Sequence, residues 1–146
     1  MNKIKWCFGQ KKGLEFIEPT SNLSDEYLKE ARQTLLRIQE NKDKWDIIMG
    51  YYACYNALYS ILMKAGIKCE IHDCTLEMVK LIPGFDSKDY AFIINLKELR
   101  KQVQYYLKDE VLKDVSSIKG FVWKCTEIRE QFDGQELRRK LNEQKK

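Results

Sequence analysis

The longest apolar segment of the chain covers residues 47–65 and contains only one charged residue, Lys64. Four tyrosines recur in this segment at helical spacings: Tyr51, Tyr52, Tyr55 and Tyr59. A helix that is apolar on nearly every side must be buried on nearly every side. We therefore predict a central helix that begins at Asp43 or Lys44, ends at Ala65 and is surrounded by several other helices.

Weaker helical periods lie on both sides of this segment. They predict helices over residues 24–41, 73–82, 87–110 and 112–132, and a short basic helix after residue 134. Residues 1–18 are expected to be irregular or to form a short strand. Only seven glycines and two prolines are present, which favours long helices over many short strands. The predicted fold class is all-α: an up-and-down bundle of four to five helices with an irregular or stranded N-terminal segment.

Polar residues and glycines mark the ends of these helices. Asn22 or Ser24 is expected to cap the first long helix, and Ser87 is expected to cap the helix that it opens. Gly66 stands where a left-handed C-terminal cap is needed. The helix over residues 87–110 has an inner face that is predicted from its apolar positions: Phe92, Leu96, Leu99, Val103, Tyr106 and Leu107.

The length of 146 residues is most simply one domain over residues 1–146, with an N-terminal extension at 1–22 and a basic tail at 134–146. The formal net charge of +4 comes from the tail. Residues 137–146 hold five basic residues and one acidic residue, whereas the other 136 residues hold 21 basic and 21 acidic ones. Such a tail can contact phosphates, although a solvated helix end is the more common meaning of a basic run.

No segment has the pattern of a signal peptide or of a membrane span. The N-terminus lacks the apolar run of a signal peptide. The uncharged stretch 47–63 carries four tyrosines, Asn56 and Ser60, and it is shorter than the roughly 20 apolar residues of a membrane-spanning helix. We therefore expect a cytoplasmic protein that does not enter a membrane.

Five cysteines are present, and a disulfide framework is not expected because the cytosol is reducing. Cys69, His72 and Cys74 lie together in the sequence CEIHDC, and Cys7 could supply a fourth zinc ligand. Their spacing matches no standard zinc knuckle, so buried packing is favoured over metal binding. Neither a metal nor another cofactor is expected.

His72 is the only histidine of the chain. It can form a hydrogen bond at the start of the helix that Asp73 opens, or it can act as a general base. Cys69 or Cys74 could in principle be a nucleophile beside it. However, the sequence contains no nucleophile motif, phosphate-binding loop or glycine-rich fingerprint.

A second suggestive segment is LKELRKQVQYYL, which starts at Leu96. Four residues fall on one face of its predicted helix: Lys97, Lys101, Gln104 and Lys108. Arg100 lies beside that face, and Tyr105 follows five residues later. An arginine near an aromatic ring and an amide can hold a phosphate or stack on a base. On the pattern alone, a solvated lysine stripe is favoured, with Tyr105 and Tyr106 packed on a partner helix.

Together the two segments resemble the HEPN superfamily, named for higher-eukaryote and prokaryote nucleotide-binding domains. Small members of that superfamily show a run of aromatic and small residues like YYACYNALYSILMKAGI, followed by a histidine, here His72. The segment LRKQVQYY is similar to a second motif on a later helix of the superfamily. The resemblance covers residues 23–132.

The resemblance implies a homodimeric helical bundle. Many members are toxin components or partners of a minimal nucleotidyltransferase. Active members are metal-independent ribonucleases that use an arginine and a following histidine with four to six residues between them. Here Arg100 matches the arginine, whereas Tyr105, Tyr106 and Leu107 occupy the positions of the histidine. A neutral tyrosine is a poor general base, and such variants are interpreted as binding or regulatory proteins.

Three hypotheses follow from this resemblance. The leading one is a HEPN-like dimer with little or no catalysis in a toxin–antitoxin-like pair. It would bind a nucleotide, RNA or a minimal nucleotidyltransferase partner through five residues: Lys97, Arg100, Lys101, Gln104 and Tyr105. The alternative is a metal-independent ribonuclease toxin that uses Arg100 with Tyr105 or His72. The third hypothesis is an assembly domain without a ligand.

Overall fold

The computed structural model describes residues 2–146, and its centre is the long helix α3 (Trp45–Ala65). Sixteen of its 21 residues are buried, which confirms the central helix that the apolar run predicts. Gly66 follows it in the left-handed conformation, with φ of 76° and ψ of 41°, as expected. The amide of Gly66 donates to the carbonyls near the end of α3 and closes the helix.

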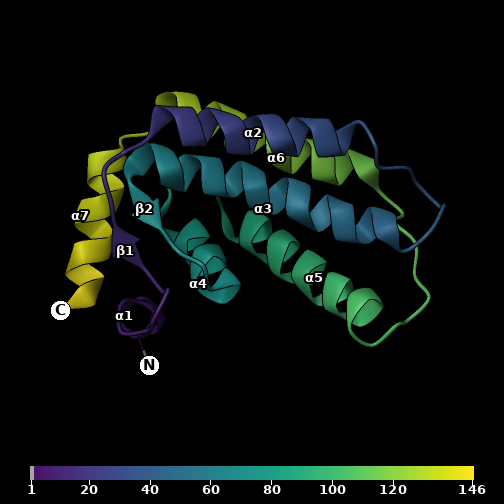
Figure 1. Ribbon diagram of the computed structural model, residues 1–146, viewed down its shortest axis with the longest axis horizontal. Helices are drawn as coiled ribbons and strands as arrows, with labels where there is room; N and C mark the ends of the chain where they lie inside the picture. Colours follow the sequence, from purple (N-terminus) through teal and green to yellow (C-terminus); the bar gives the residue numbers. More distant parts are fainter. Residues whose placement is uncertain (1) are drawn as a thin grey trace.

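Three long helices pack along α3 in alternating directions (Figure 1). They are α2 (Ser21–Leu35), α5 (Ser87–Gln104) and α6 (Val115–Gln131). With α3 they form an up-and-down bundle, so the all-α prediction is confirmed. A second group of short elements closes one end of this bundle: α1 (Lys3–Phe8), α4 (His72–Glu77), the 3-10 turn Met78–Leu81 and α7 (Gly134–Lys145).

The N-terminal segment is more ordered than its sequence predicts. A two-residue strand is present as expected: β1 (Glu15–Phe16) pairs antiparallel with β2 (Ile67–Lys68). Helix α1 was not expected. Its first turn is capped by Asn2, whose side chain accepts from the Lys5 amide, and it buries only Ile4 and Cys7. Six residues with two buried positions are too few to give a helical period.

Two of the predicted caps are wrong. Thr20, not Asn22 or Ser24, caps α2, because its side chain accepts from the Leu23 amide. The hydroxyl of Ser24 is buried and donates to the Ser60 carbonyl, 2.6 Å away. Helix α5 is capped by Asp86 rather than by Ser87. Asp86 forms a reciprocal capping box with Asp89, which a serine one residue later cannot provide.

Helices α2, α5 and α6 are shorter than predicted. Helix α2 ends at Leu35 instead of near Asn41, and α6 begins at Val115 instead of Leu112. Helix α5 ends at Gln104, and Leu107 beyond it has a positive φ of 55°. As a result, Tyr106 and Leu107 are exposed and do not belong to the inner face of α5.

The structure also contains a disulfide, which corrects the expectation of thiols only. Cys7 of α1 and Cys74 of α4 are bonded, with a Cα–Cα distance of 5.9 Å. The two cysteines are 67 residues apart in the sequence, so no local pattern pairs them. Cys54, Cys69 and Cys125 are buried free thiols.

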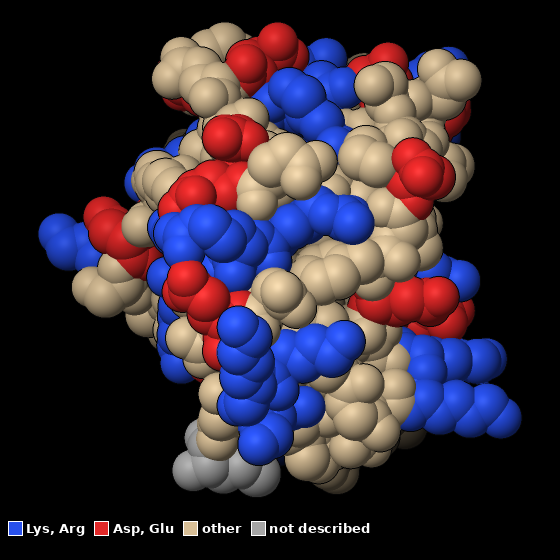
Figure 2. Space-filling model, turned by 90° about the vertical axis from the view of Figure 1, so that its left-hand side faces the viewer, with Lys and Arg blue, Asp and Glu red and all other residues tan. Residues whose placement is uncertain are grey.

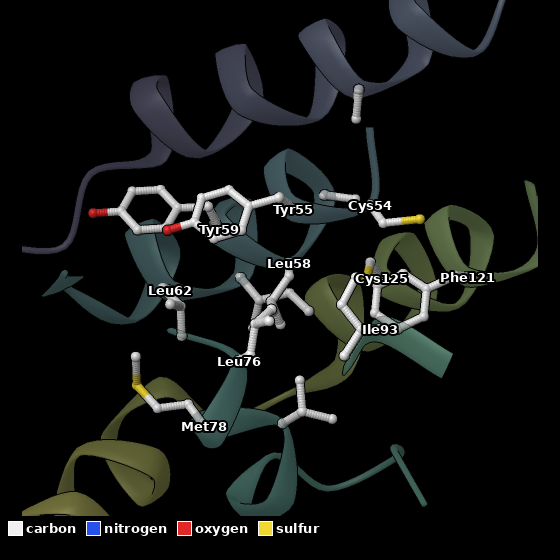
Figure 3. Packing of buried hydrophobic residues seen from close by; sticks show 14 of the residues in the cluster. Cys54, Tyr55, Leu58, Tyr59, Leu62, Leu76, Met78, Ile93, Phe121 and Cys125 are labelled. Atoms are coloured by element: carbon white, nitrogen blue, oxygen red, sulfur yellow. The ribbon is translucent and has the colours of Figure 1, made fainter. Parts of the chain in front are cut away.

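The core forms where α3 meets its neighbours (Figure 3). Leu58 and Cys54 of α3 point toward side chains of α4, α5 and α6, including Leu76, Ile93 and Phe121. Within residues 2–146 no helix is long and apolar enough to cross a membrane. Helix α3 has 21 residues and is long enough, but four tyrosines and the charged residues near its two ends lower its hydropathy.

Candidate functional site

Arg100 lies on α5 where this helix faces α3, and only 6% of its surface is exposed. Three tyrosine rings surround its guanidinium carbon. The distances from Cζ to the ring centroids are 4.5 Å for Tyr51, 5.7 Å for Tyr52 and 5.5 Å for Tyr105. Tyr51 and Tyr52 come from α3, and Tyr105 follows the last turn of α5. Aromatic faces attract a cation at these distances.

The hydrogen bonds of Arg100 go to neutral groups. Its Nη1 donates to Gln104 Oε1 at 3.2 Å, to the Tyr105 hydroxyl at 3.4 Å and to the Tyr52 hydroxyl at 3.5 Å. Its Nε is buried and has no partner. No carboxylate of residues 2–146 lies within 4 Å of the guanidinium. A buried charge is ordinarily paired with an opposite charge, so the absence of an anion here is unusual.

His72 lies beside the same tyrosine that faces Arg100. Its Nδ1 is 2.8 Å from the Tyr51 hydroxyl. Its ring stacks on Tyr55, with centroids 4.1 Å apart, and the Tyr55 hydroxyl donates to Thr75. The fold therefore brings together His72 from the start of α4, Tyr51 from α3 and Arg100 from α5. We call these three residues with Tyr52, Gln104 and Tyr105 the Arg100 cluster.

Burial shifts the pKa of two groups of the cluster, His72 and Tyr51, toward their uncharged forms. Burial, together with the positive charge of Arg100, lowers the pKa of His72 below its ordinary value of 6.5. Burial raises the pKa of the Tyr51 and Tyr55 hydroxyls well above their ordinary value of 10.0. At neutral pH the imidazole of His72 and the hydroxyl of Tyr51 are therefore both uncharged.

The neutral imidazole has two possible tautomers. In the tautomer whose Nδ1–H donates to the Tyr51 oxygen, Nε2 is unprotonated and can accept a proton. In the other tautomer the Tyr51 hydroxyl donates to Nδ1, and Nε2–H can donate to a ligand. In either tautomer Nε2 remains chemically able to accept a hydrogen bond from a ligand hydroxyl or to donate one to a ligand oxygen.

The two lysines of the predicted site are engaged with acidic residues. Lys97 forms an ion pair with Asp73, the residue that follows His72. Lys101 is 3.7 Å from Glu98 on the same helix. The structure thus brings Arg100, Gln104 and Tyr105 together, whereas Lys97 reaches the α4 side of the cluster and Lys101 remains on the surface of α5.

The cysteine and histidine residues of CEIHDC do not converge. Cys74 is in the disulfide, Cys69 Sγ contacts the carbonyl of Ile71, and His72 bonds to Tyr51. Across the described residues, no group of three or more His, Cys, Asp or Glu side chains is arranged to hold a metal ion.

Sequence reasoning missed Tyr51 and Tyr52 as members of the site. Their positions in the repeat of tyrosines along α3 were the available signal, but that pattern does not show which side chain faces which neighbour. Tyr51 is fully buried and joins Arg100 to His72, while Tyr52 keeps part of its surface accessible.

A pocket lies apart from the Arg100 cluster. A pocket of about 390 Å³ between α5 and the segment that leads into α6 is lined by apolar residues, among them Phe92, Leu99 and Ile118. Its lining contains neither Arg100 nor His72. Its lining also includes Lys113 with two acidic residues, Glu110 and Asp114, whereas the buried Arg100 has no carboxylate partner among residues 2–146. We therefore assign the candidate chemistry to the Arg100 cluster.

No family model matches this chain, and no curated protein or solved structure is detectably similar to it. A function for this chain can therefore be inferred from the geometry of the Arg100 cluster and from the resemblance of the two sequence segments.

Proposed function

We propose that this chain is a HEPN-like protein that binds the phosphate group of a nucleotide or of RNA at Arg100. The observation that carries the proposal is the buried guanidinium, which contacts only neutral side chains and keeps an unpaired Nε. Desolvating a cation without an anion is costly. A phosphate oxygen would supply the missing negative charge, and arginine binds phosphates in a fixed fork geometry.

Tyr105 would contribute contacts to the base. It is 62% exposed although its hydroxyl is within hydrogen-bond distance of Arg100. A base could therefore stack on its open ring face while the phosphate lies at the guanidinium. Tyr106 and Leu107, which are also exposed, extend this surface.

The oligomeric state and the partner belong to the same proposal. The exposed residues Tyr105–Leu107 form an apolar patch at the end of α5, next to the cluster. We propose that a homodimer forms through this end of α5, and that a minimal nucleotidyltransferase is the partner in a toxin–antitoxin-like pair. Support for both comes from the sequence resemblance and from the exposed patch.

The test is a binding titration with a fluorescent 5′-phosphorylated dinucleotide. Arg100→Met keeps the length of the side chain but removes the charge, and it should weaken binding at least about tenfold because a charge-assisted contact is lost. Arg37→Met, at an exposed arginine after α2, is the matched control and should change affinity less than twofold. Equal affinity of the two variants, or no binding by the wild type, would refute the proposal.

A second function is favoured by the position of His72. With Nε2 unprotonated, the imidazole can take the proton from a ribose 2′-hydroxyl, whose oxygen then attacks the adjacent phosphorus. Arg100 would stabilise the charge that develops on the phosphoryl oxygens. The Tyr105 hydroxyl can donate a proton to the departing 5′-oxygen. The products would be a 2′,3′-cyclic phosphate and a free 5′-hydroxyl.

This ribonuclease activity is tested by incubating the protein with RNA in EDTA. Cleavage that disappears in both His72→Ala and Arg100→Met, but persists in Arg37→Met, would support it. Cleavage that survives His72→Ala would exclude the imidazole as the base. If the wild type leaves the RNA intact but binds the dinucleotide, the protein is a binder rather than an enzyme.

A further inference from the structure

The two ends of the chain carry most of its positive charge. Residues 2–12 contain four lysines and no acidic residue, and residues 134–146 contain five basic and two acidic residues. Together the two segments have a net charge of +7. Since the whole chain has +4, the remainder has a net charge of −3. The sequence shows a basic tail, but its pairing with the N-terminal lysines depends on the fold.

The fold places the two basic segments side by side. The Asn2 side chain donates to the Gln144 carbonyl at 2.9 Å, and the Lys145 amine lies 5.1 Å from the centre of the Phe8 ring. Figure 2 shows the side of the molecule that carries α1 and α7, where Lys and Arg side chains gather near the termini. We call this surface the end face, defined by five exposed lysines: Lys5, Lys11, Lys12, Lys145 and Lys146.

The lysines of the end face differ from the neighbouring arginines. Arg139 forms ion pairs with Glu136 and Glu143, and Arg138 donates to backbone carbonyls. By contrast, no carboxylate in the part of the chain that the structure describes lies within 4 Å of any end-face lysine amine. These lysines are therefore available to an external polyanion.

The end face is joined to the helix that carries His72 of the Arg100 cluster. The disulfide joins α1 to α4, and the positive charge of Lys3 on α1 contributes to the lowered pKa of Asp73 on α4. A hydrogen bond from Lys97 is the main cause of the lowered pKa of Asp73, and the charges of Lys3 and Lys101 lower it further. Asp73 directly follows His72, so cations of α1 and α5 meet at the edge of the cluster.

We propose that the end face binds the backbone of single-stranded RNA and directs the strand to the Arg100 cluster. This proposal rests on the proposed function, because it names RNA as the ligand and extends its site. The aromatic contribution is Trp6, which is 40% exposed among the lysines and has the Lys3 amine 4.8 Å from its ring. A basic track with an accessible ring is suited to phosphates and stacked bases.

A single-stranded nucleic acid fits this surface better than an anionic membrane does. Membrane-bound helices need an exposed apolar face. Helix α1 buries its apolar residues Ile4 and Cys7, and α7 buries Leu137 and Leu141. The accessible apolar surface of the two helices is limited to Trp6 and the half-buried Phe8, so the positive charge is the dominant feature of the end face.

The experiment compares two triple charge reversals. Lys5→Glu/Lys11→Glu/Lys146→Glu changes the end face, and Lys42→Glu/Lys113→Glu/Lys119→Glu changes exposed lysines at the opposite end of the bundle. Both variants have the same net charge. Anisotropy titrations use a labelled single-stranded RNA of about 20 nucleotides, long enough for both surfaces, and a labelled 5′-phosphorylated dinucleotide that only the Arg100 cluster would hold. Circular dichroism verifies folding.

We expect the end-face variant to bind the long RNA at least about tenfold more weakly than the control variant. The slope of log affinity against log salt should also become shallower by about 2, because each lost phosphate contact contributes about 0.7. Dinucleotide affinity should be the same in both variants, since the end face is not needed for a short ligand.

The outcomes separate the two proposals. Equal long-RNA affinity of the two triple variants, with intact dinucleotide binding, overturns the end face alone. A second outcome is that the end-face variant loses binding to the long RNA while the wild type does not bind the dinucleotide. This result overturns the Arg100 site and the proposal that the end face directs RNA to it. Binding of the wild type to vesicles of anionic phospholipid, without binding to RNA, overturns the choice of RNA.

Discussion

Two arginines of this protein make similar aromatic contacts but have different electrostatic partners. The Arg138 guanidinium lies 4.6 Å from the Phe16 ring centre, and that of Arg100 lies 4.5 Å from Tyr51. Arg138 donates to the carbonyls of Ile17, Ala65 and Gly66, two of them at the C-terminal end of α3. The negative end of a helix dipole suits a cation, so Arg138 has the environment of a structural arginine.

Arg100 has no such environment. Its acceptors are two hydroxyls and an amide, and its Nε has no partner. Arg138 is half-buried and Arg100 is buried, yet both contact an aromatic ring, so an aromatic contact does not separate a structural cation from a ligand-binding one. The separating feature is whether the fold itself supplies the negative charge.

The largest effect that we expect concerns the end of the molecule that Arg138 helps to close. Reduction of the disulfide, or the double variant Cys7→Ser/Cys74→Ser, should lower the free energy of unfolding by about 4 kcal/mol. The bond closes a loop of 67 residues, and the chain-entropy estimate grows with loop length. Urea denaturation with and without reductant measures the change. An unchanged transition midpoint would show that this link contributes nothing.

The next largest effect is a difference in stability between substitutions at the two arginines. Arg138→Met should lower the free energy of unfolding by about 2 to 3 kcal/mol, because three carbonyl acceptors lose their donor. Arg100→Met should change it by less than about 1 kcal/mol, since the lost ring contact is offset by removal of an unpaired buried charge. Urea denaturation of both variants gives the comparison. If Arg100→Met is the more destabilising of the two, Arg100 is a structural residue.

A smaller effect concerns the titration of His72. Burial and Arg100 place its pKa below 6.5 in the folded protein, so protonation favours the unfolded chain and stability should fall as the pH drops below about 6.5. Proton NMR can follow this single imidazole. In Arg100→Met the pKa should rise only partly toward 6.5, because burial remains the main cause. In Arg138→Met it should stay unchanged, and a shift there would contradict the separation of the two regions.

Much of the fold could be predicted because its signals are local. The apolar run of α3 and the left-handed Gly66 each depend on neighbouring residues. The Cys7–Cys74 pair, in contrast, depends on contacts across 67 residues. Helix α5 ends early at Gln104, although apolar residues continue its period to Leu107, because the chain turns there with a positive φ.

The residues of the candidate site also divide into those that a local pattern predicts and those that only the fold brings together. Arg100, Gln104 and Tyr105 lie within two turns of one sequence segment, so helical spacing could group them. Tyr51 and His72 join them only through the packing of α3, α4 and α5, which no local pattern specifies. The charge of the end face is likewise visible in the sequence only as two separate lysine-rich segments.

The central claim is that Arg100 binds the anionic group of a ligand. The most direct test measures whether ligand binding changes the pKa of His72. The imidazole is titrated by NMR with and without saturating 5′-phosphorylated dinucleotide. A phosphate at Arg100 would offset the positive charge that lowers the pKa of His72, so we predict a higher pKa in the complex. An identical His72 titration in the bound and free protein would place the ligand elsewhere and contradict the claim.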